Sequence, residues 1–169
     1  MVKLSQILAQ KGCIMFYTVY ESDLIGKIIL YGEKDYLAGL EFYKNQNIDK
    51  KYMENKEVFT NIIKQLEKYF KKKLKFFDIP LRLNVTYFQK KVYEELIKIP
   101  YGTTISYQEL AIRIGNKKAS RAVGNANGKN PIAIIIPCHR VISKNGTIGG
   151  YSGNLNIKRK LLQLEGLKF

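Results

Sequence analysis

A cysteine and a histidine stand side by side in the segment Ile136-Pro137-Cys138-His139-Arg140. His139 is the only histidine of the chain, and Cys138 is one of its two cysteines. A thiol is strongly nucleophilic as the thiolate, and a neighbouring imidazole is one way in which proteins favour that form. The pair therefore indicates nucleophilic chemistry at Cys138. The alternative is a small buried hydrophobic residue without reactivity, which is common among free cysteines.

The apolar run before this pair predicts how the cysteine is presented. Residues 132–136 are rich in isoleucine and are bounded by Pro131 and Pro137. This pattern predicts a short buried strand. Because proline cannot donate a hydrogen bond to a sheet, we expect the strand to end at Pro137 and to present Cys138 at its end.

Length and composition limit the possible classes of protein. A chain of 169 residues with 46% hydrophobic residues is long enough for one medium domain or two small ones. No apolar run approaches the roughly 20 residues of a membrane-spanning helix, and the first ten residues lack a signal-peptide pattern. Two cysteines and one histidine are too few for a Cys/His zinc site. We expect a cytoplasmic protein with reduced thiols, no metal and no cofactor.

The positive charge is unevenly distributed along the chain. The net charge is +15, of which residues 1–80 carry +4 and residues 81–169 carry +11. Positive charge concentrated in one half is typical of a protein that binds a polyanion, most often nucleic acid. A lysine-rich composition without such a partner is the alternative explanation of the charge.

The first half of the sequence predicts a small α/β domain. Apolar and aromatic segments at 13–20, 26–31 and 35–42 predict three strands in a meander. The period then changes, and residues 55–73 predict a helix with one apolar face. No group of residues in this half indicates catalysis, so we expect a supporting domain. Pro80 marks the predicted boundary between a domain of residues 1–80 and one of residues 81–169.

One end of the predicted first helix is strongly basic. Lys71, Lys72 and Lys73 follow one another close to its C-terminus. Cations suit the negative pole of a helix dipole. The simplest interpretation of this triplet is a solvated helix end.

The second half predicts several short helices. Thr86-x-x-Gln89 and Ser106-x-x-Glu109 have the form of capping boxes, and Gly115 can end the helix that begins after Ser106. A further helical stretch at 118–127 follows closely, which predicts a helix-turn-helix. A last helix is expected to begin after Asn154 and to end at Glu165-Gly166.

The second helix of this predicted pair is unusual in composition. Residues 119–128 contain two glycines and few large side chains, and Arg121 is their one long cation. Glycine costs a helix about 1 kcal/mol per residue relative to alanine, which is accepted where something must approach the backbone. Close approach of DNA explains this composition, and tight packing against a neighbouring helix is the alternative.

Read together, these segments resemble the O6-alkylguanine-DNA alkyltransferases. The resemblance covers about residues 81–167, and the matching segments are 99–102, 106–111, 120–124, 130–131, 136–142, 149–153 and 161–166. It implies an α/β (α+β) protein with a ribonuclease-H-like N-terminal domain, built from a three-stranded sheet and a helix. The C-terminal domain would be mainly helical, with a helix-turn-helix and a short strand leading to the reactive cysteine.

The resemblance also implies a reaction and the residues that perform it. Cys138 would accept the alkyl group of O6-alkylguanine, and of O4-alkylthymine, in a single turnover that forms a stable thioether. His139 would act as the base through a water molecule, and Glu165 would orient the imidazole ring. Asn130 would hold the backbone near the site. Tyr107 would offer its hydroxyl group to a ring nitrogen of the leaving guanine.

The damaged nucleotide would have to leave the base stack, because its alkyl group is inaccessible in double-stranded DNA. Arg121 would fill the vacated space, while its helix lies in the minor groove. The residues expected to contact DNA are Gln108, Asn116, Lys118, Ser120, Arg121, Ala122 and Gly124. The residues expected to line the base pocket are Asn127, Val141, Tyr151 and Ser152. A monomer is expected.

Two other functions compete with this interpretation. A lesion sensor or transcription regulator could use the same helix-turn-helix without any chemistry, although the presence of Cys138 argues against it. A cysteine hydrolase could use Cys138 and His139. Hydrolases usually bring these two residues from separate segments, and a peptidase does not require a domain of charge +11.

Overall fold

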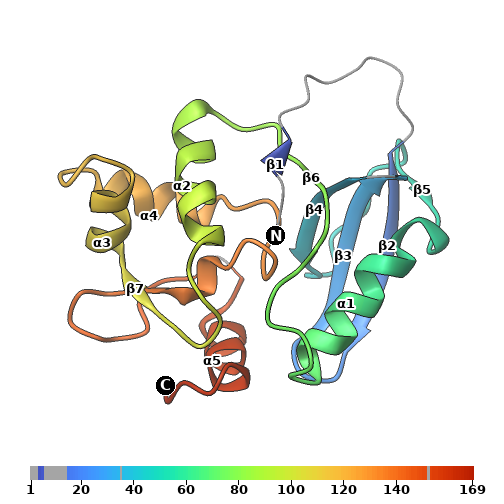
Figure 1. The fold of residues 1–169 in the computed structure, drawn as a ribbon. Coiled ribbons are helices and arrows are strands. Elements are labelled where there is room, and N and C mark those ends of the chain that lie inside the picture. Colours follow the sequence, from blue (N-terminus) through green and yellow to red (C-terminus); the bar gives the residue numbers. More distant parts are fainter. Residues whose placement is uncertain (1–3, 6–14, 35, 152) are drawn as a thin grey trace. The chain divides into compact units, whose positions relative to one another are not determined.

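The computed structural model describes residues 4–5, 15–34, 36–151 and 153–169 (Figure 1). The chain forms two compact units, Met1–Asn84 and Val85–Phe169. The predicted boundary at Pro80 lies a few residues before this division. Strand β6 (Leu81–Arg82) pairs with β1 (Leu4–Ser5) and with β4 (Tyr36–Phe42), so residues 81–84 belong to the first unit.

Three long antiparallel strands form the centre of the first unit: β2 (Phe16–Ser22), β3 (Gly26–Glu33) and β4 (Tyr36–Phe42). The predicted meander is confirmed for these residues, while Cys13 and Asp35, at two of the predicted strand starts, lie outside the described residues.

The sheet is larger than the three strands predicted. Its order is β1-β6-β4-β3-β2-β5, where β5 is Met53–Glu54. The three additional strands are two residues long each and pair in parallel with their neighbours. Segments this short carry no detectable alternation of apolar and polar residues, which explains why the sequence did not indicate them.

A short 3₁₀ turn, η1 (Glu57–Phe59), leads into helix α1 (Thr60–Phe70). The helix crosses one face of the sheet in Figure 1 and buries Ile62, Ile63, Leu66 and Tyr69. It ends at Phe70, three residues before the predicted end. Lys72 adopts a left-handed conformation with φ of 59°, and the amide of Lys73 turns back to the carbonyl of Lys68.

The second unit begins with helix α2 (Tyr87–Ile97). The predicted capping box is confirmed: Thr86 Oγ1 accepts from the amide of Gln89, and Gln89 Oε1 accepts from the amide of Thr86. The buried hydroxyl of Tyr93 lies 3.1 Å from the carbonyl oxygen of Ala126 and 3.0 Å from that of Lys129. This side chain ties α2 to the end of the second helix of the predicted helix-turn-helix.

The helix-turn-helix consists of α3 (Tyr107–Arg113) and α4 (Ser120–Gly128), which pack against each other. Ser106 caps α3, since its Oγ accepts from the amide of Glu109 at 3.0 Å. The carboxylate of Glu109 pairs with Arg113 at 2.7 Å. Gly115 takes a positive φ of 81° just after α3, as its predicted role at the helix end requires.

The segment before the cysteine is not the strand that the sequence predicted. Residues 133–135 form a turn between a single bridge residue, Ile132, and a bend at Ile136, in which the amide of Ile136 bonds to the carbonyl of Ile132 and Ile134 has φ of 72°. The Asn130 side chain holds both ends of the turn, because Oδ1 accepts from the amide of Ile132 and Nδ2 donates to the carbonyl of Ile136. The run is apolar because it is fully buried, and a short apolar run does not distinguish a buried strand from a buried turn.

The remaining elements surround this turn. A 3₁₀ turn, η2 (Cys138–Arg140), leads into β8 (Val141–Ile142), which pairs in parallel with β7 (Ile105–Ser106). Helix α5 (Leu155–Leu164) closes the unit, and the predicted cap is confirmed because Asn154 Oδ1 accepts from the amide of Asn156. Within the described residues, no helix is long and apolar enough to cross a membrane.

Candidate active site

Cys138 is the first residue of η2 and is only 2% exposed. Two asparagine side chains hold the backbone around it. Asn130 Nδ2 donates to the carbonyl of Ile136, and Asn127 Nδ2 donates to the carbonyl of Cys138 at 3.3 Å. Asn130 therefore contacts the backbone just before the cysteine, and Asn127, which was predicted for the base pocket, contacts the carbonyl of the cysteine itself.

The thiol group of Cys138 is protonated in its resting environment. Burial raises its pKa, while hydrogen bonds from Asn130 and Tyr151 and the positive charge of Lys158 act in the opposite direction. The Tyr151 hydroxyl lies 3.9 Å from Sγ. Because burial is the largest of these effects, formation of a thiolate requires a base.

His139 is fully buried and is oriented by Glu165. The distance between His139 Nε2 and Glu165 Oε1 is 2.9 Å. Because a carboxylate can only accept, Nε2 carries the hydrogen and Nδ1 keeps its lone pair. Nδ1 has no hydrogen-bond partner among the residues that the structure describes. Burial lowers the pKa of His139, so that the ring is neutral and can accept a proton.

Glu165 is the centre of a buried network that extends beyond His139. Arg140 donates to it through Nε, at 2.9 Å and 3.2 Å from the two oxygens, and through Nη2 at 2.8 Å. The amide of Gly102 donates to Oε2 at 3.0 Å. Burial by itself raises the pKa of Glu165, but the hydrogen bonds and charges of His139 and Arg140 outweigh it and hold the pKa well below its usual range. Glu165 therefore remains a carboxylate.

A cavity of about 250 Å³ lies beside the cysteine turn. Its lining residues are Tyr107, Gly124, Asn127, Gly128, Gly150 and Tyr151. The Tyr107 hydroxyl donates to the carbonyl of Gly150 at 3.2 Å, and burial raises the pKa of Tyr107, so this group is a proton-bearing donor. Tyr151 connects the cavity to Sγ of Cys138. Of the residues predicted for the base pocket, Asn127 and Tyr151 line the cavity, Val141 is buried without lining it, and Ser152 lies outside the described residues.

Two family models cover most of the chain. Residues 15–83 match the ribonuclease-like domain of 6-O-methylguanine DNA methyltransferase, and residues 87–167 match its DNA binding domain. The chain belongs to the 6-O-methylguanine DNA methyltransferase family. Membership carries the activity of that family, which is DNA repair by transfer of an alkyl group to a cysteine of the protein itself.

Curated relatives agree with this membership. The methylated-DNA–protein-cysteine methyltransferase of Methanosarcina acetivorans is 49% identical over 155 residues, which cover 90% of this chain and 99% of the relative. The protein of the same name from Haemophilus influenzae is 40% identical over 159 residues, covering 92% and 88%. Since these relatives are methyltransferases, the interpretations as a lesion sensor without chemistry and as a hydrolase are not favoured.

Solved structures agree with the fold. The crystal structure of Mycobacterium tuberculosis OGT in complex with DNA has a TM-score of 0.84 and 44% identity, covering 89% of this chain and 92% of that one. The O6-methylguanine-DNA methyltransferase of Pyrococcus kodakaraensis, at 23% identity, shares the fold with a TM-score of 0.64 and covers 91% of this chain and all of its own. The predicted α/β fold class is confirmed, apart from the number of strands and the turn before Cys138.

Apart from one arginine, the exposed residues of α4 have small side chains. Its exposed residues are Arg121, Ala122, Asn125 and Gly128. Gly124 faces inward, and a Cβ atom at this position would lie 3.7 Å from the Tyr107 ring. The Arg121 side chain makes no hydrogen bond or ion pair with any residue that the structure describes.

The other predicted DNA contacts are distributed over the same motif. Asn116 and Lys118 are exposed in the turn between α3 and α4, where Asn116 Oδ1 accepts from the amide of Lys118. Ser120 and Gln108 are half-buried, at the start of α4 and in α3. The described residues contain no group of three or more His, Cys, Asp or Glu side chains that could hold a metal ion.

Sequence reasoning missed Lys158, a fully buried lysine of α5. Its Nζ donates to the carbonyls of Val141, at 2.6 Å, and Gly150, at 3.2 Å, and so joins the strand after the cysteine to the cavity wall. Burial lowers the pKa of Lys158 to about 8. A signal was present in the spacing, because Lys158, Leu161 and Glu165 repeat at the interval of one helix face.

Sequence reasoning also missed the roles that Arg140 and the turn at residues 100–102 have around Glu165. Arg140 Nη1 donates to the carbonyl of Ile99, and the Tyr101 hydroxyl donates to the carbonyl of Leu164. Gly102 has φ of 72°, and a Cβ atom there would lie 3.0 Å from the backbone oxygen of Glu165. This turn therefore supports Glu165, a role that its local sequence did not indicate.

Proposed function

We propose that this protein accepts the alkyl group of O6-alkylguanine, and of O4-alkylthymine, onto Cys138, once per molecule. The observation that carries the proposal is a thiol beside a cavity, next to a neutral imidazole that a buried carboxylate holds in one tautomer. Most free cysteines lack such a neighbour and are unreactive. The 2.9 Å contact between His139 and Glu165 supports a base and an orienting group beside this cysteine.

The proposed reaction moves one proton and forms one bond. The Cys138 thiol loses its proton to His139 Nδ1 through a water molecule, and the charge that develops on the ring is stabilised by Glu165. The thiolate attacks the alkyl carbon, the carbon–oxygen bond breaks, and its electron pair passes to the purine. Tyr107 donates a hydrogen bond to a ring nitrogen of the purine, which disperses this negative charge.

The reaction ends with a thioether. A thioether sulfur is a poor leaving group, and the proposed mechanism contains no step that would release the alkyl group from Cys138. Each molecule therefore reacts once. Lys158 Nζ donates to the carbonyls of Val141 and Gly150, and its positive charge favours the Cys138 thiolate before the reaction. After the reaction the sulfur is an uncharged thioether, so Lys158 no longer faces a negative charge there.

We further propose that α4 binds in the minor groove of double-stranded DNA and that Arg121 takes the place of the flipped nucleotide. The small exposed residues of α4 support this proposal because they allow the helix backbone to approach a groove closely. The guanidinium of Arg121, which pairs with none of the described residues, supports it because a long cation can occupy the vacated stack. The protein would act as a monomer in the cytoplasm, where the acceptor thiol stays reduced.

Intact-mass spectrometry tests the proposed reaction. After incubation with a duplex that carries O6-methylguanine, the protein is expected to gain the mass of one methyl group, located in the peptide that contains Cys138. An unmodified duplex is the control and should leave the mass unchanged. Repeated turnover, or a methyl group on Cys13, would contradict the proposal.

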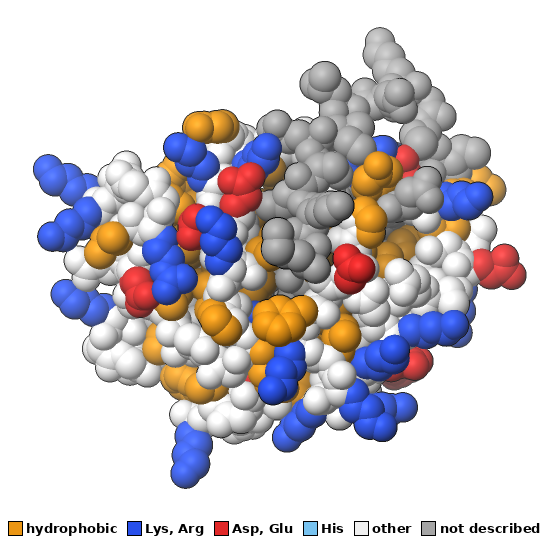
Figure 2. Space-filling view, in the orientation of Figure 1, with side chains coloured by type: hydrophobic (Ala, Val, Ile, Leu, Met, Phe, Trp, Pro, Cys, Tyr) orange, Lys and Arg blue, Asp and Glu red, His pale blue; other side chains and the backbone are white. Residues whose placement is uncertain are grey.

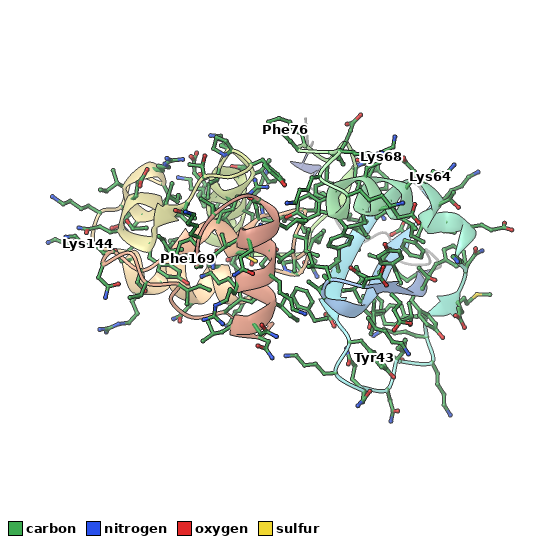
Figure 3. All side chains as sticks on the ribbon, turned by 90° about the horizontal axis from the view of Figure 1, so that it is seen from below. Tyr43, Lys64, Lys68, Phe76, Lys144 and Phe169 are labelled. Atoms are coloured by element: carbon green, nitrogen blue, oxygen red, sulfur yellow. The ribbon has the colours of Figure 1, made fainter. Side chains whose placement is uncertain are left out.

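Arg121→Ala tests the flipping role. The variant is expected to repair O6-methylguanine in a duplex about 10- to 100-fold more slowly, because the cost of unstacking is no longer offset. Reaction with the free modified base, which needs no flipping, should stay close to that of the wild type. Lys144→Ala removes another exposed cation of the same unit (Figure 3) and should leave both rates unchanged. Equal losses on both substrates would exclude flipping as the role of Arg121.

A further inference from the structure

The charge excess of the first unit is confined to one segment. Residues 60–76 contain six lysines and one glutamate, whereas the rest of residues 1–84 contains nine basic and nine acidic residues. The first unit is therefore electrically balanced except along α1 and the turn that follows it. Composition alone would have spread the lysines evenly over the unit.

These lysines gather on the outer side of α1. Lys64, Lys68 and Lys71 recur at intervals of four and three residues, opposite the buried face of the helix, and Lys72 and Lys73 follow directly. We call these five residues the α1 lysine surface. All five are exposed. Basic side chains cover this part of the unit in Figure 2, and Lys64 and Lys68 point outward in Figure 3.

Within the described part of the chain, no acidic side chain pairs with the α1 lysine surface. None of the five side chains forms an ion pair or a hydrogen bond with a residue that the structure describes. Like charges four residues apart destabilise a helix, as at Lys64 and Lys68. The helix dipole favours cations in the last turn but does not account for Lys64. If the first unit only supported the second, there would be no reason for five exposed lysines to gather on one side of α1.

We infer that the α1 lysine surface is a second DNA-binding surface, which contacts phosphates outside the helix-turn-helix. This inference rests on the proposed function, in which DNA is the substrate. The helix rises about 1.5 Å per residue, so the stretch from Lys64 to the end of α1 at Phe70 spans about 9 Å, the axial length of about two to three phosphates of one strand. Phe76, 69% exposed, lies on the same side of the unit (Figure 3) and adds an apolar contact.

DNA is the polyanion favoured over an anionic membrane. A protein that already holds a duplex through one surface meets further phosphates at a high effective concentration, so weak contacts by a second surface contribute strongly. Such contacts carry no base specificity. They would prolong the residence of the protein on undamaged DNA while it searches for a lesion.

The test compares two triple variants of the full chain. Lys64→Gln/Lys68→Gln/Lys71→Gln removes three charges from the α1 lysine surface. Lys27→Gln/Lys50→Gln/Lys56→Gln removes three exposed charges elsewhere in the same unit. Affinity for an unmodified duplex is measured as a function of salt, and methyl transfer from free O6-methylguanine is measured on the same preparations.

The first variant should reduce the slope of log affinity against log salt by about two to three, and the affinity near 0.1 M salt by about 10- to 100-fold. The control variant should change the slope by less than about one. Transfer from the free base should match the wild type in both variants, which shows that the second unit is intact, and a thermal melt of each variant shows that the first unit is folded.

Three results would overturn the inference. Equal slope changes in both variants would mean that only total charge matters. An unchanged slope in the first variant would mean that these lysines only solvate the helix end. Lost binding to vesicles of anionic lipid, with DNA binding intact, would assign the surface to membranes. A wild-type protein that transfers no methyl group would refute the proposed function instead, whatever the slopes.

Discussion

Cys138→Ala is expected to abolish alkyl transfer while DNA affinity stays within about twofold of the wild type. The variant lacks the only atom that the proposed mechanism alkylates. Its fold should persist, because Cys138 is held through its backbone: its amide bonds to the carbonyl of Ile136, and its carbonyl accepts from Asn127. Removing one buried sulfur costs about 1 kcal/mol or slightly more. Transfer is measured with a duplex labelled in the methyl group, and binding with the same duplex unlabelled.

The matched control is Cys13→Ala, which removes the other cysteine of the chain. This variant should accept one methyl group per molecule at the wild-type rate. Transfer that survives in Cys138→Ala would show that the nucleophile is wrong. Loss of both transfer and DNA binding in Cys138→Ala would point to unfolding, and a thermal melt of the variant separates that case from a chemical one.

The parts of the fold that depend on local sequence were predictable. The apolar face of α1 and the caps of α2 and α3 are encoded within a few residues of each element, and each lies where the sequence indicated. The two-residue strands were not predictable, since their pairing depends on partners far along the chain, as in β1 with β6. The apolar run before Cys138 satisfied the pattern of a strand but is folded by the Asn130 side chain into a turn.

The same distinction applies to the candidate site. Cys138 and His139 are adjacent in sequence, so a short motif was sufficient to identify them. Lys158 and Arg140 act through backbone carbonyls of distant segments, such as those of Gly150 and Ile99. No residue type is needed at such an acceptor, and the sequence therefore carries no trace of the contact. The one signal that the sequence offered for Lys158 was its spacing from Leu161 and Glu165 on one face of the helix.

Glu165→Gln is expected to lower the free energy of unfolding of the second unit by about 3–5 kcal/mol, because it leaves the buried guanidinium of Arg140 without its carboxylate. Repair should also slow by about 10²- to 10⁴-fold. An amide can donate to His139 Nε2 as well as accept from it, so the ring is no longer held in the tautomer that keeps Nδ1 free. Urea denaturation and single-turnover transfer at neutral pH measure the two effects. Glu109→Gln, which breaks an exposed ion pair with Arg113, is the control and should cost less than about 1 kcal/mol.

The difference in stability between the wild type and Glu165→Gln should depend on pH in a defined direction. The pKa of Glu165 is lower in the folded protein than its ordinary value of 4.5, so the folded state binds this proton less readily than the unfolded state. The contribution of the carboxylate is therefore complete above about pH 4.5 and is lost as the pH falls towards the folded-state pKa. Denaturation midpoints of the two proteins should converge on acidification and stay well apart at pH 6 and above. A constant difference across this range would mean that Glu165 stabilises the unit by packing, and that the charge of the carboxylate beside His139 and Arg140 contributes nothing.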